Sequence, residues 1–438
     1  MKFSHHLDKG LWAFASKSLP AINGVAFVFL VVRFLPQEQY GAFVVVQTIF
    51  TFATALVNAL AFLPLVKFAS EKEDHGVYVI AAFVISSVFL AATVAGVVLF
   101  RDEFVGLVGG GPAAAELMVY LPFLFLTVYY RNFAVMLLQA TYRLRRIFWI
   151  EAVYLLGTPL LILGTRLSGF FHSADDLFRI ILVTQTCSSI LAFFVTRGEM
   201  HLRFSFDRTA LMEMWNFGKY TFGSTALYAA FAQLDVFFVS AAGGLAAVAT
   251  YNASKVFTKV FDLISQVSQV FLVPYSSRRF ASGDTQTLAV TAEKAIGFSL
   301  ILLLPLGICM TVIPDVLLRL LYGAKYVDGV PIVRILGFMT IILPWNAVVA
   351  SYVVGTGKVM QGLWSGILLV SMALPLYALL TPLFGAWGTS LGYVIAMACT
   401  SCYLVVFIRK FIPIGIPGVV GRWRDVREFV RELIRSRT

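Results

Sequence analysis

The chain has 438 residues, of which 59% are hydrophobic and only 13% are charged, and its formal net charge is +11. A typical soluble domain carries about a quarter charged residues, so this composition excludes a soluble protein and indicates a polytopic membrane protein. The positive excess does not indicate nucleic-acid binding, because cytoplasmic loops that face anionic membrane lipids explain it.

The chain contains about twelve apolar runs of 19 or more residues, and ~20 residues at 1.5 Å rise cover a ~30 Å hydrocarbon core. In chain order we expect spans at approximately 11–34, 42–66, 77–99, 117–139, 147–166, 177–196, 217–241, 247–273, 289–313, 331–354, 360–382 and 386–408. The first follows the basic segment Lys2 to Lys9 and has no small-residue cleavage site, so we interpret it as a retained span. The sequence predicts an all-α, multi-pass membrane protein.

The second half of the chain repeats features of the first at an offset of roughly 210 to 216 residues, too long for a solenoid period. The matching segments, first copy then second, are Leu138–Arg143 and Val353–Lys358, Gly109–Gly111 and Tyr322–Ala324, and Gln39–Gly41 and Thr250–Asn252. Duplicated bundles are typical of secondary transporters, which bind their substrate between the repeats. We therefore expect two six-helix lobes.

These lobes divide the chain into four expected parts. They are an N-terminal lobe at 1–200, a cytoplasmic inter-lobe linker at 201–216, a C-terminal lobe at 217–410 and a cytoplasmic amphipathic basic tail at 411–438. In the linker, Asp207 is expected to cap a short helix from Arg208 to Asn216 that leads into the seventh span. In the tail, apolar residues alternate with arginines from Val419 onward, which indicates a helix lying flat on the inner leaflet as a membrane anchor.

The basic residues predict the orientation of the bundle. An even number of spans places both termini on one side, and clusters such as Arg143, Arg145 and Arg146 fall on that side. Cytoplasmic loops are enriched in lysine and arginine, so we expect both termini in the cytoplasm and the protein in the cytoplasmic membrane.

No enzyme motif is present in the sequence. Gly109–Pro112 lacks the lysine and hydroxyl of a phosphate loop, and there is no H-E-x-x-H helix and no G-x-S-x-G turn. Cys399 and Cys402 have C-x-x-C spacing without a second pair of ligands, so we interpret the cysteines as small core residues. We expect no catalytic residue, no metal and no cofactor, and transport driven by an ion gradient, by mass action or by a partner.

Six ionisable residues lie within the expected spans, where a charge at the bilayer centre costs ~2.5–3.5 kcal/mol on insertion scales. They are Lys17, Arg131, Lys255, Lys259, Asp235 and Asp262. One interpretation is that Asp235–Lys255 and Lys259–Asp262 are closed ion pairs that hold the seventh and eighth spans together. Lys17 lies near the inner end of its span, so we expect its side chain to extend to the interface.

The other interpretation is that these side chains line a water-filled cavity between the lobes. Uncharged polar residues in the spans would complete its lining: Asn23, Gln47, Asn58, Gln139, Gln233, Gln266 and Asn346. The repeat offset aligns Arg131 with Asn346, and each stands beside an aromatic residue. Four cations against two carboxylates predict a positive cavity and an anionic ligand.

Three segments carry a resemblance to a known family. They are Gly10–Lys17 followed by Arg33–Gly41, Arg203–Arg208 through Phe217-Gly218, and Leu317–Tyr326 with Val333–Leu336. These segments resemble the start, the inter-lobe region and the loop before the tenth helix of polysaccharide repeat-unit flippases (Wzx type, O-antigen and exopolysaccharide export). Those flippases belong to the multidrug/oligosaccharidyl-lipid/polysaccharide (MOP) exporter superfamily.

The resemblance implies a fold like that of the MATE transporters and a function in glycan export. The protein would move a polyprenyl-diphosphate-linked oligosaccharide to the outer leaflet by alternating access, together with polysaccharide assembly proteins. Arg131, Lys255, Lys259 and Lys17 would bind the substrate, and Asp235 and Asp262 would form ion pairs or couple transport to H⁺ or Na⁺. The coupling ion stays open.

Two other functions are weighed against this one. A MATE-like antiporter of multiple drugs or organic ions would share the fold, but it would favour an acidic cavity. A membrane O-antigen polymerase or ligase would need catalytic residues on a large outward-facing loop, and no expected outer loop is long enough to supply them.

Overall fold

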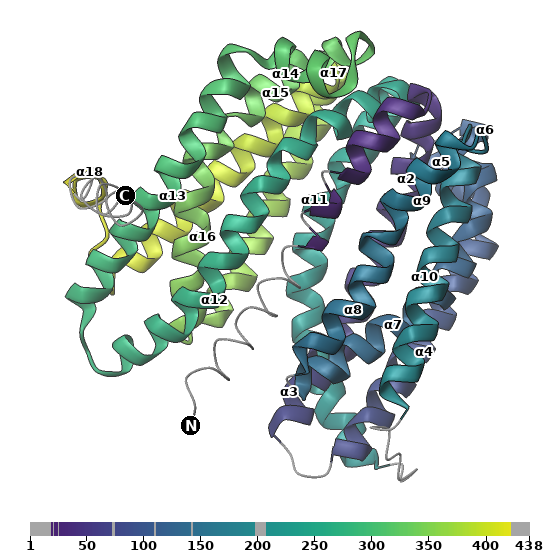
Figure 1. The fold of residues 1–438 in the computed structure, drawn as a ribbon. Coiled ribbons are helices and arrows are strands. Elements are labelled where there is room, and N and C mark those ends of the chain that lie inside the picture. Colours follow the sequence, from purple (N-terminus) through teal and green to yellow (C-terminus); the bar gives the residue numbers. More distant parts are fainter. Residues whose placement is uncertain are drawn as a thin grey trace, which may run out of the picture. The chain divides into compact units, whose positions relative to one another are not determined.

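The computed structural model describes residues 19–20, 22–24, 26–71, 75–108, 111–141, 143–197 and 207–421. Within these ranges every secondary-structure element is a helix and no strand occurs (Figure 1). The all-α prediction is therefore confirmed for the described part of the chain. Lys17 and the tail beyond Gly421 lie outside it, so the predicted membrane-surface helix stays a prediction.

The helices follow one another with short connections. The first series is α2 (Gln37–Val57), the π-helix η1 (Asn58–Phe62), α3 (Leu63–Glu71), α4 (His75–Leu99), α5 (Arg101–Val108), α6 (Gly111–Leu117), η2 (Met118–Tyr120), α7 (Leu121–Ala140), α8 (Leu144–Leu155), α9 (Gly157–Leu167), α10 (Ala174–Thr196) and α11 (Arg208–Lys255). The second series is η3 (Val256–Thr258), α12 (Lys259–Ala281), α13 (Thr285–Val312), α14 (Pro314–Tyr322), η4 (Ala324–Gly329), α15 (Val330–Leu336), α16 (Met339–Gly355), α17 (Val359–Arg409) and α18 (Ile416–Gly421).

Eight helices among the described residues are long and apolar enough to cross a membrane, or nine if the bent pair Ala324–Leu336 and Met339–Gly355 is one span. Two of the eight far exceed one crossing, because α11 has 48 residues and α17 has 51. At 1.5 Å per residue a straight helix of either length would extend more than ~70 Å, against a ~30 Å hydrocarbon core, so each has enough residues for two crossings. The protein is a multi-pass membrane protein, and the number of twelve spans stays a prediction.

Both long helices are interrupted at a single glycine. Gly244 in α11 has φ 69° and Gly385 in α17 has φ 64°. This left-handed backbone region is open to glycine at little cost and disfavours residues with a Cβ atom. Each long helix thus contains two helical segments that meet at the glycine, and these breaks fall between the seventh and eighth and between the eleventh and twelfth expected spans.

Helix α11 begins at Arg208, as expected, and Asp207 Oδ1 accepts a 2.8 Å hydrogen bond from the Thr209 backbone at its start. The helix does not end at Asn216 but continues without a break, and the sequence between Arg208 and Gly244 contains no proline. Gly218 lies within this helix, against the backbone of Leu60. A Cβ atom at Gly218 would lie 2.3 Å from the carbonyl oxygen of Leu60. Glycine at this position therefore serves close packing.

The repeat seen in the sequence has matching helix boundaries. Helix α7 ends with Thr141 as its C-cap, and α8 begins after Arg143. At the matching place in the second copy, α16 ends with Thr356 as its C-cap and α17 begins after Lys358. Gly111 and Gly323, which lie within the matching segments Gly109–Gly111 and Tyr322–Ala324, both have positive φ angles.

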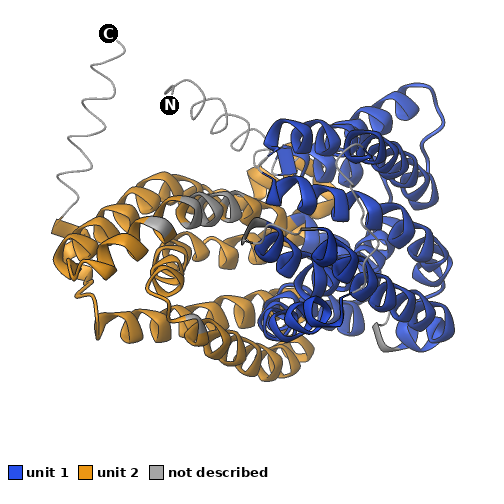
Figure 2. Cartoon of the chain, turned by 90° about the horizontal axis from the view of Figure 1, so that it is seen from below, with its two compact units in different colours: residues 1–253 blue, residues 254–438 orange. Residues whose placement is uncertain are grey.

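The chain forms two compact units, residues 1–253 and residues 254–438 (Figure 2). In unit 1, Ala210 and Met214 of α11 join a hydrophobic core with residues of η1, α3, α4 and α7. In unit 2 a second core combines residues of α12, α13, α16 and α17. The lobe boundaries expected from the repeat, 1–200 and 217–410, stay predictions.

Candidate functional site

Arg131 is a buried cation of unit 1. It lies in the middle of α7 and is 8% exposed. Its guanidinium carbon lies 4.4 Å from the centre of the Tyr154 ring on α8, and its Nη2 donates a long hydrogen bond of 3.4 Å to the Asn132 side chain. The Nε and Nη1 atoms are buried and have no hydrogen-bond partner among the described residues.

This arrangement compensates only part of the cost of burying the guanidinium. A cation over a desolvated aromatic face gains about 2 kcal/mol. Each buried donor left without a partner costs ~1–3 kcal/mol, and burying an ion costs several kcal/mol before compensation. Two N–H groups of Arg131 are therefore left without acceptors among the described residues in this conformation. A guanidinium can pair with phosphate oxygens through parallel hydrogen bonds once its surroundings open to a ligand.

A polar stripe runs along α2 and η1. Gln47, Thr51, Thr54 and Asn58 follow one another at helical spacing and share one face. Gln47 Nε2 donates to Thr51 Oγ1 at 3.5 Å, whereas Thr54 Oγ1 and Asn58 Oδ1 are buried without a hydrogen-bond partner. Asn58 begins the π-helix, an irregularity that is frequent at functional sites. On the helix Ile22–Phe34, Asn23 Oδ1 is also buried without a partner.

Asp235 differs from Arg131 because its carboxylate is partnered. It is 0% exposed, its Oδ2 accepts a 2.6 Å hydrogen bond from the Tyr251 hydroxyl, and its Oδ1 accepts one of 2.8 Å from the Val236 backbone. In the matching repeat position, the Tyr40 hydroxyl donates to Asn252 Oδ1 at 2.7 Å. Both repeat tyrosines are buried. In unit 1 the Tyr40 hydrogen bond connects the segment after Gly244 to α2, and the Tyr251 hydrogen bond connects the same segment to the first part of α11.

Unit 2 holds three of the predicted site residues with described side chains. Lys255 is half-buried, and its Nζ lies 5.2 Å from the ring centre of Tyr393. Lys259 is exposed at the start of α12. Asn346 Nδ2 donates to Ser401 Oγ at 3.1 Å.

The remaining predicted residues are dispersed. Gln139 is exposed on α7 and Gln233 is half-buried on α11. Lys17 and the side chains of Asp262 and Gln266 lie outside the described residues. The ion pairs Asp235–Lys255 and Lys259–Asp262 and the cavity assignments therefore stay predictions.

Sequence reasoning missed Thr54, Tyr154, Tyr251, Tyr393 and Ser401, which accompany the predicted residues. The spacing of Thr51 and Thr54 with Gln47 and Asn58 is visible in the sequence and could have identified the stripe. Tyr251 was part of the repeat alignment, but its role depends on packing against Asp235. Tyr154 carries no sequence signal, because which face of α8 meets α7 is a property of the folded unit.

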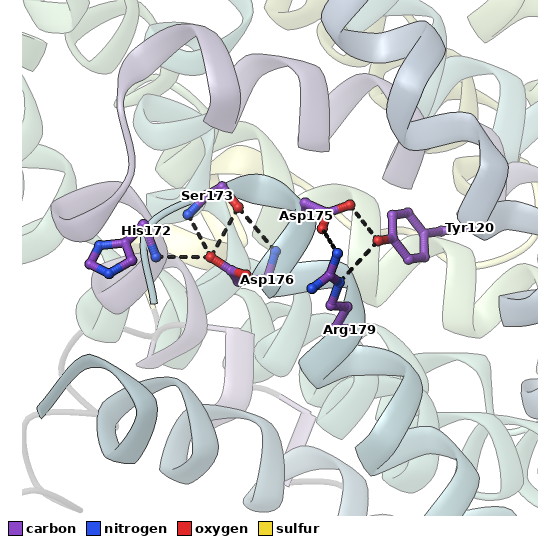
Figure 3. A network of polar contacts seen from close by, with 6 residues as sticks. All are labelled: Tyr120, His172, Ser173, Asp175, Asp176 and Arg179. Carbon is purple, nitrogen blue, oxygen red and sulfur yellow. Dashed lines mark hydrogen bonds and ion pairs between the residues drawn. The ribbon is translucent and has the colours of Figure 1, made fainter. Parts of the chain in front are cut away.

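A second polar cluster lies at the start of α10 (Figure 3). Ser173 caps the helix in a capping box with Asp176, whose Oδ2 accepts hydrogen bonds of 3.0 Å from the His172 and Ser173 backbones. Arg179 forms a 2.5 Å ion pair with Asp175, and Tyr120 donates a hydrogen bond to the same carboxylate. Because the charged groups of this cluster pair with one another and with the backbone, the cluster stabilises the α9–α10 connection. We assign no ligand to the cluster.

The class of the protein follows from its fold. The structure is similar to an inward-facing multidrug resistance MATE family transporter of the MOP superfamily, with a TM-score of 0.75 and 15% identity over 91% of this chain and 97% of that one. It is also similar to the lipid II flippase MurJ in an inward closed conformation, with a TM-score of 0.73 and 14% identity over 98% of this chain and 93% of that one. A third similar structure is a MOP superfamily transporter from Pyrococcus furiosus, described by the reversed polarity of its binding pocket. Its TM-score is 0.65, with 15% identity over 91% of this chain and 93% of that one. The protein has the fold of the MOP superfamily.

The sequence gives the family within that class. Residues 30–331 match the polysaccharide biosynthesis protein family, so the chain belongs to this family. A membrane protein of Methanocaldococcus jannaschii, itself uncharacterized, is 26% identical over 210 residues, which cover 47% of this chain and 41% of the relative. The resemblance to the polysaccharide flippases is thus confirmed at the level of family and fold.

Proposed function

We propose that this protein is a flippase that moves a polyprenyl-diphosphate-linked oligosaccharide across the cytoplasmic membrane by alternating access. The observation that carries the proposal is Arg131, a buried guanidinium with two donor atoms that lack a partner. A diphosphate supplies the negative charge and the oxygen acceptors that these donors need. The polysaccharide biosynthesis family and the likeness in fold to a lipid II flippase support this cargo.

The physical task fits a polar path through an apolar bundle. Moving a hydroxyl from water into hydrocarbon without a partner costs ~4–8 kcal/mol, and an oligosaccharide carries many hydroxyls. Side chains such as those of the polar stripe, Gln47, Thr51, Thr54 and Asn58, would replace water for the sugar. The lipid tail stays in the bilayer, so only the headgroup needs this path. Lys255 and Lys259 are proposed to add positive charge in unit 2.

The second candidate is an antiporter of multiple drugs or organic ions, which the likeness in fold to a multidrug MATE transporter favours. An organic cation would be repelled by the Arg131 guanidinium, whose positive charge no carboxylate within the described residues neutralises. Because of this positive charge, the glycolipid flippase is the favoured candidate.

A transport assay distinguishes the two functions. The purified protein is reconstituted in vesicles with a polyprenyl-diphosphate glycolipid, and the fraction of sugar accessible to an added glycosidase is followed over time. Parallel vesicles are tested for uptake of a labelled organic cation. We expect glycolipid movement without cation uptake, whereas cation uptake without glycolipid movement would overturn the proposal.

A further inference from the structure

Unit 1 contains a cavity of about 690 Å³ between α4 and the first part of α11, with Leu60 of η1 also in its lining. The two helices run in the same direction along it. The Tyr78 hydroxyl donates to Glu213 Oε2 at 2.8 Å, and further along, the rings of Phe89 and Phe222 lie 6.0 Å apart. The cavity is therefore a groove along both helices.

Most of the groove is apolar and open. Val88 of α4 is 67% exposed, and Met212 of α11 is about half exposed. The lining residues of α11 run from Arg208 to Phe222, a rise of ~21 Å along the helix. One leaflet accounts for half of a ~30 Å hydrocarbon core, or ~15 Å. The groove is long enough for an acyl chain of one leaflet.

The lining also includes two cations, Arg208 and Lys219, both exposed. Lys219 Nζ donates to Asn216 Oδ1 at 3.0 Å, so its charge is directed back along α11 toward Arg208. Trp215, which is 47% exposed, lies between the two cations along the helix. Tryptophan is enriched where hydrocarbon meets the headgroups, so this end of the groove has the character of an interface.

Two carboxylates near these cations accept hydrogen bonds from neutral groups, and neither belongs to the lining of the groove. Glu213 accepts the hydrogen bond from Tyr78, and Asp207 accepts one of 2.8 Å from the Thr209 backbone. A second cavity of about 700 Å³, lined by α4 and α7 through residues such as Ser87, Val94 and Leu126, has no charged residue in its lining. Two cavities of similar size on the same helix thus differ in charge.

We propose that the α4–α11 groove binds an anionic diacyl phospholipid of the membrane, with its phosphate beside Arg208, toward which the Lys219 ammonium is directed, and an acyl chain that runs from Met212 toward the level of Val88. Charge complementarity selects the anionic headgroup, and the length of the groove matches a chain confined to one leaflet rather than a long polyprenyl chain. The site shares no residue with the surroundings of Arg131, so the inference is independent of the transported cargo.

The test is lipid binding to the full chain in detergent, measured by native mass spectrometry with phosphatidylglycerol, phosphatidylcholine or a polyprenyl phosphate. A basic residue near a lipid surface contributes ~1 kcal/mol, which corresponds to about fivefold in affinity. We expect phosphatidylglycerol to bind more tightly than phosphatidylcholine, and Arg208→Gln and Lys219→Gln each to weaken it about fivefold. Arg278→Gln, which removes an exposed cation of α12, is the control and should have no effect.

Two tryptophan variants of exposed alanines on α4 test the location without removing a charge. Ala92→Trp should fill the charged groove and displace the bound phosphatidylglycerol, while Ala95→Trp should fill the uncharged cavity and leave it bound. The proposal is overturned by equal binding of the two phospholipids, by equal effects of the two tryptophans, or by a polyprenyl phosphate that binds while phosphatidylglycerol does not.

Discussion

Arg131 and Asp235 are both buried charges of unit 1, but their surroundings differ. Asp235 has a hydrogen bond at each carboxylate oxygen, whereas Arg131 has an aromatic face, one long hydrogen bond and two donor atoms without a partner. A buried polar group with its partners in place rigidifies the fold, whereas one that lacks partners is costly to the fold. We therefore propose a structural role for Asp235 and a binding role for Arg131.

The largest effect is expected at Arg131. Arg131→Gln should slow glycolipid transport by about 10- to 100-fold, because a hydrogen bond to a charged group contributes ~1.5–3 kcal/mol. Arg131→Lys keeps the charge but loses the planar pair of donors, so we expect an intermediate rate. The glycosidase assay in vesicles measures both. Arg179→Gln, which removes an exposed and paired cation, is the matched control and should transport at the normal rate.

The next effect is on stability at Asp235. Asp235→Ala leaves the Tyr251 hydroxyl buried without its acceptor, which should lower the unfolding free energy by ~1–3 kcal/mol. Tyr251→Phe should cost about 1 kcal/mol, and in the double variant the two losses should not add. Thermal unfolding in detergent measures the series. Additive losses would show that the hydroxyl and the carboxylate do not interact.

A pair of glycines in α11 tests the close packing of that helix in unit 1. Gly218→Ala places a methyl group 2.3 Å from the Leu60 carbonyl oxygen and should destabilise the protein by ~1–3 kcal/mol. Gly223→Ala, five residues later in the same helix, meets nothing within 4 Å and should be neutral or slightly stabilising. Equal melting temperatures for the two variants would contradict the packing.

The cations of unit 2 are expected to contribute less than Arg131. Lys255 is half-buried beside Tyr393, while Lys259 is exposed, so Lys255→Gln should reduce the transport rate about fivefold and Lys259→Gln about twofold or less. The same vesicle assay measures both. Normal transport by the double variant would remove both lysines from the proposed site.

The smallest effect is a pH dependence at the N-terminus of α13. Hydrogen bonds from the Thr287 hydroxyl and backbone, together with the charge of Arg279, hold the pKa of Asp284 below its usual value. A lowered pKa in the folded state means that the ionised carboxylate stabilises the fold above its unfolded pKa and loses this effect as the pH falls through the folded value. The stability difference between the wild type and Asp284→Ala should therefore shrink in acid, as melting curves at several pH values can show. A stability difference that does not change with pH would contradict the lowered pKa of Asp284.

The sequence predicted the helical class, the family and the position of Arg131 within an apolar helix, because long apolar runs and the quoted segments are local signals. It did not predict the close approach of Gly218 to Leu60, since this contact joins residues far apart in the chain. The sequence placed Lys255 and Lys259 within the expected spans, but it did not show that Lys255 is half-buried and Lys259 exposed. The face that a side chain presents depends on how neighbouring helices pack.

Phosphorus NMR of a polyprenyl-diphosphate glycolipid bound to the reconstituted protein tests most directly whether Arg131 binds the headgroup. We expect the diphosphate resonances to shift on binding to the wild type, and this shift to be lost with Arg131→Gln and retained with Arg179→Gln. An unchanged shift in a folded Arg131→Gln protein would contradict the central claim.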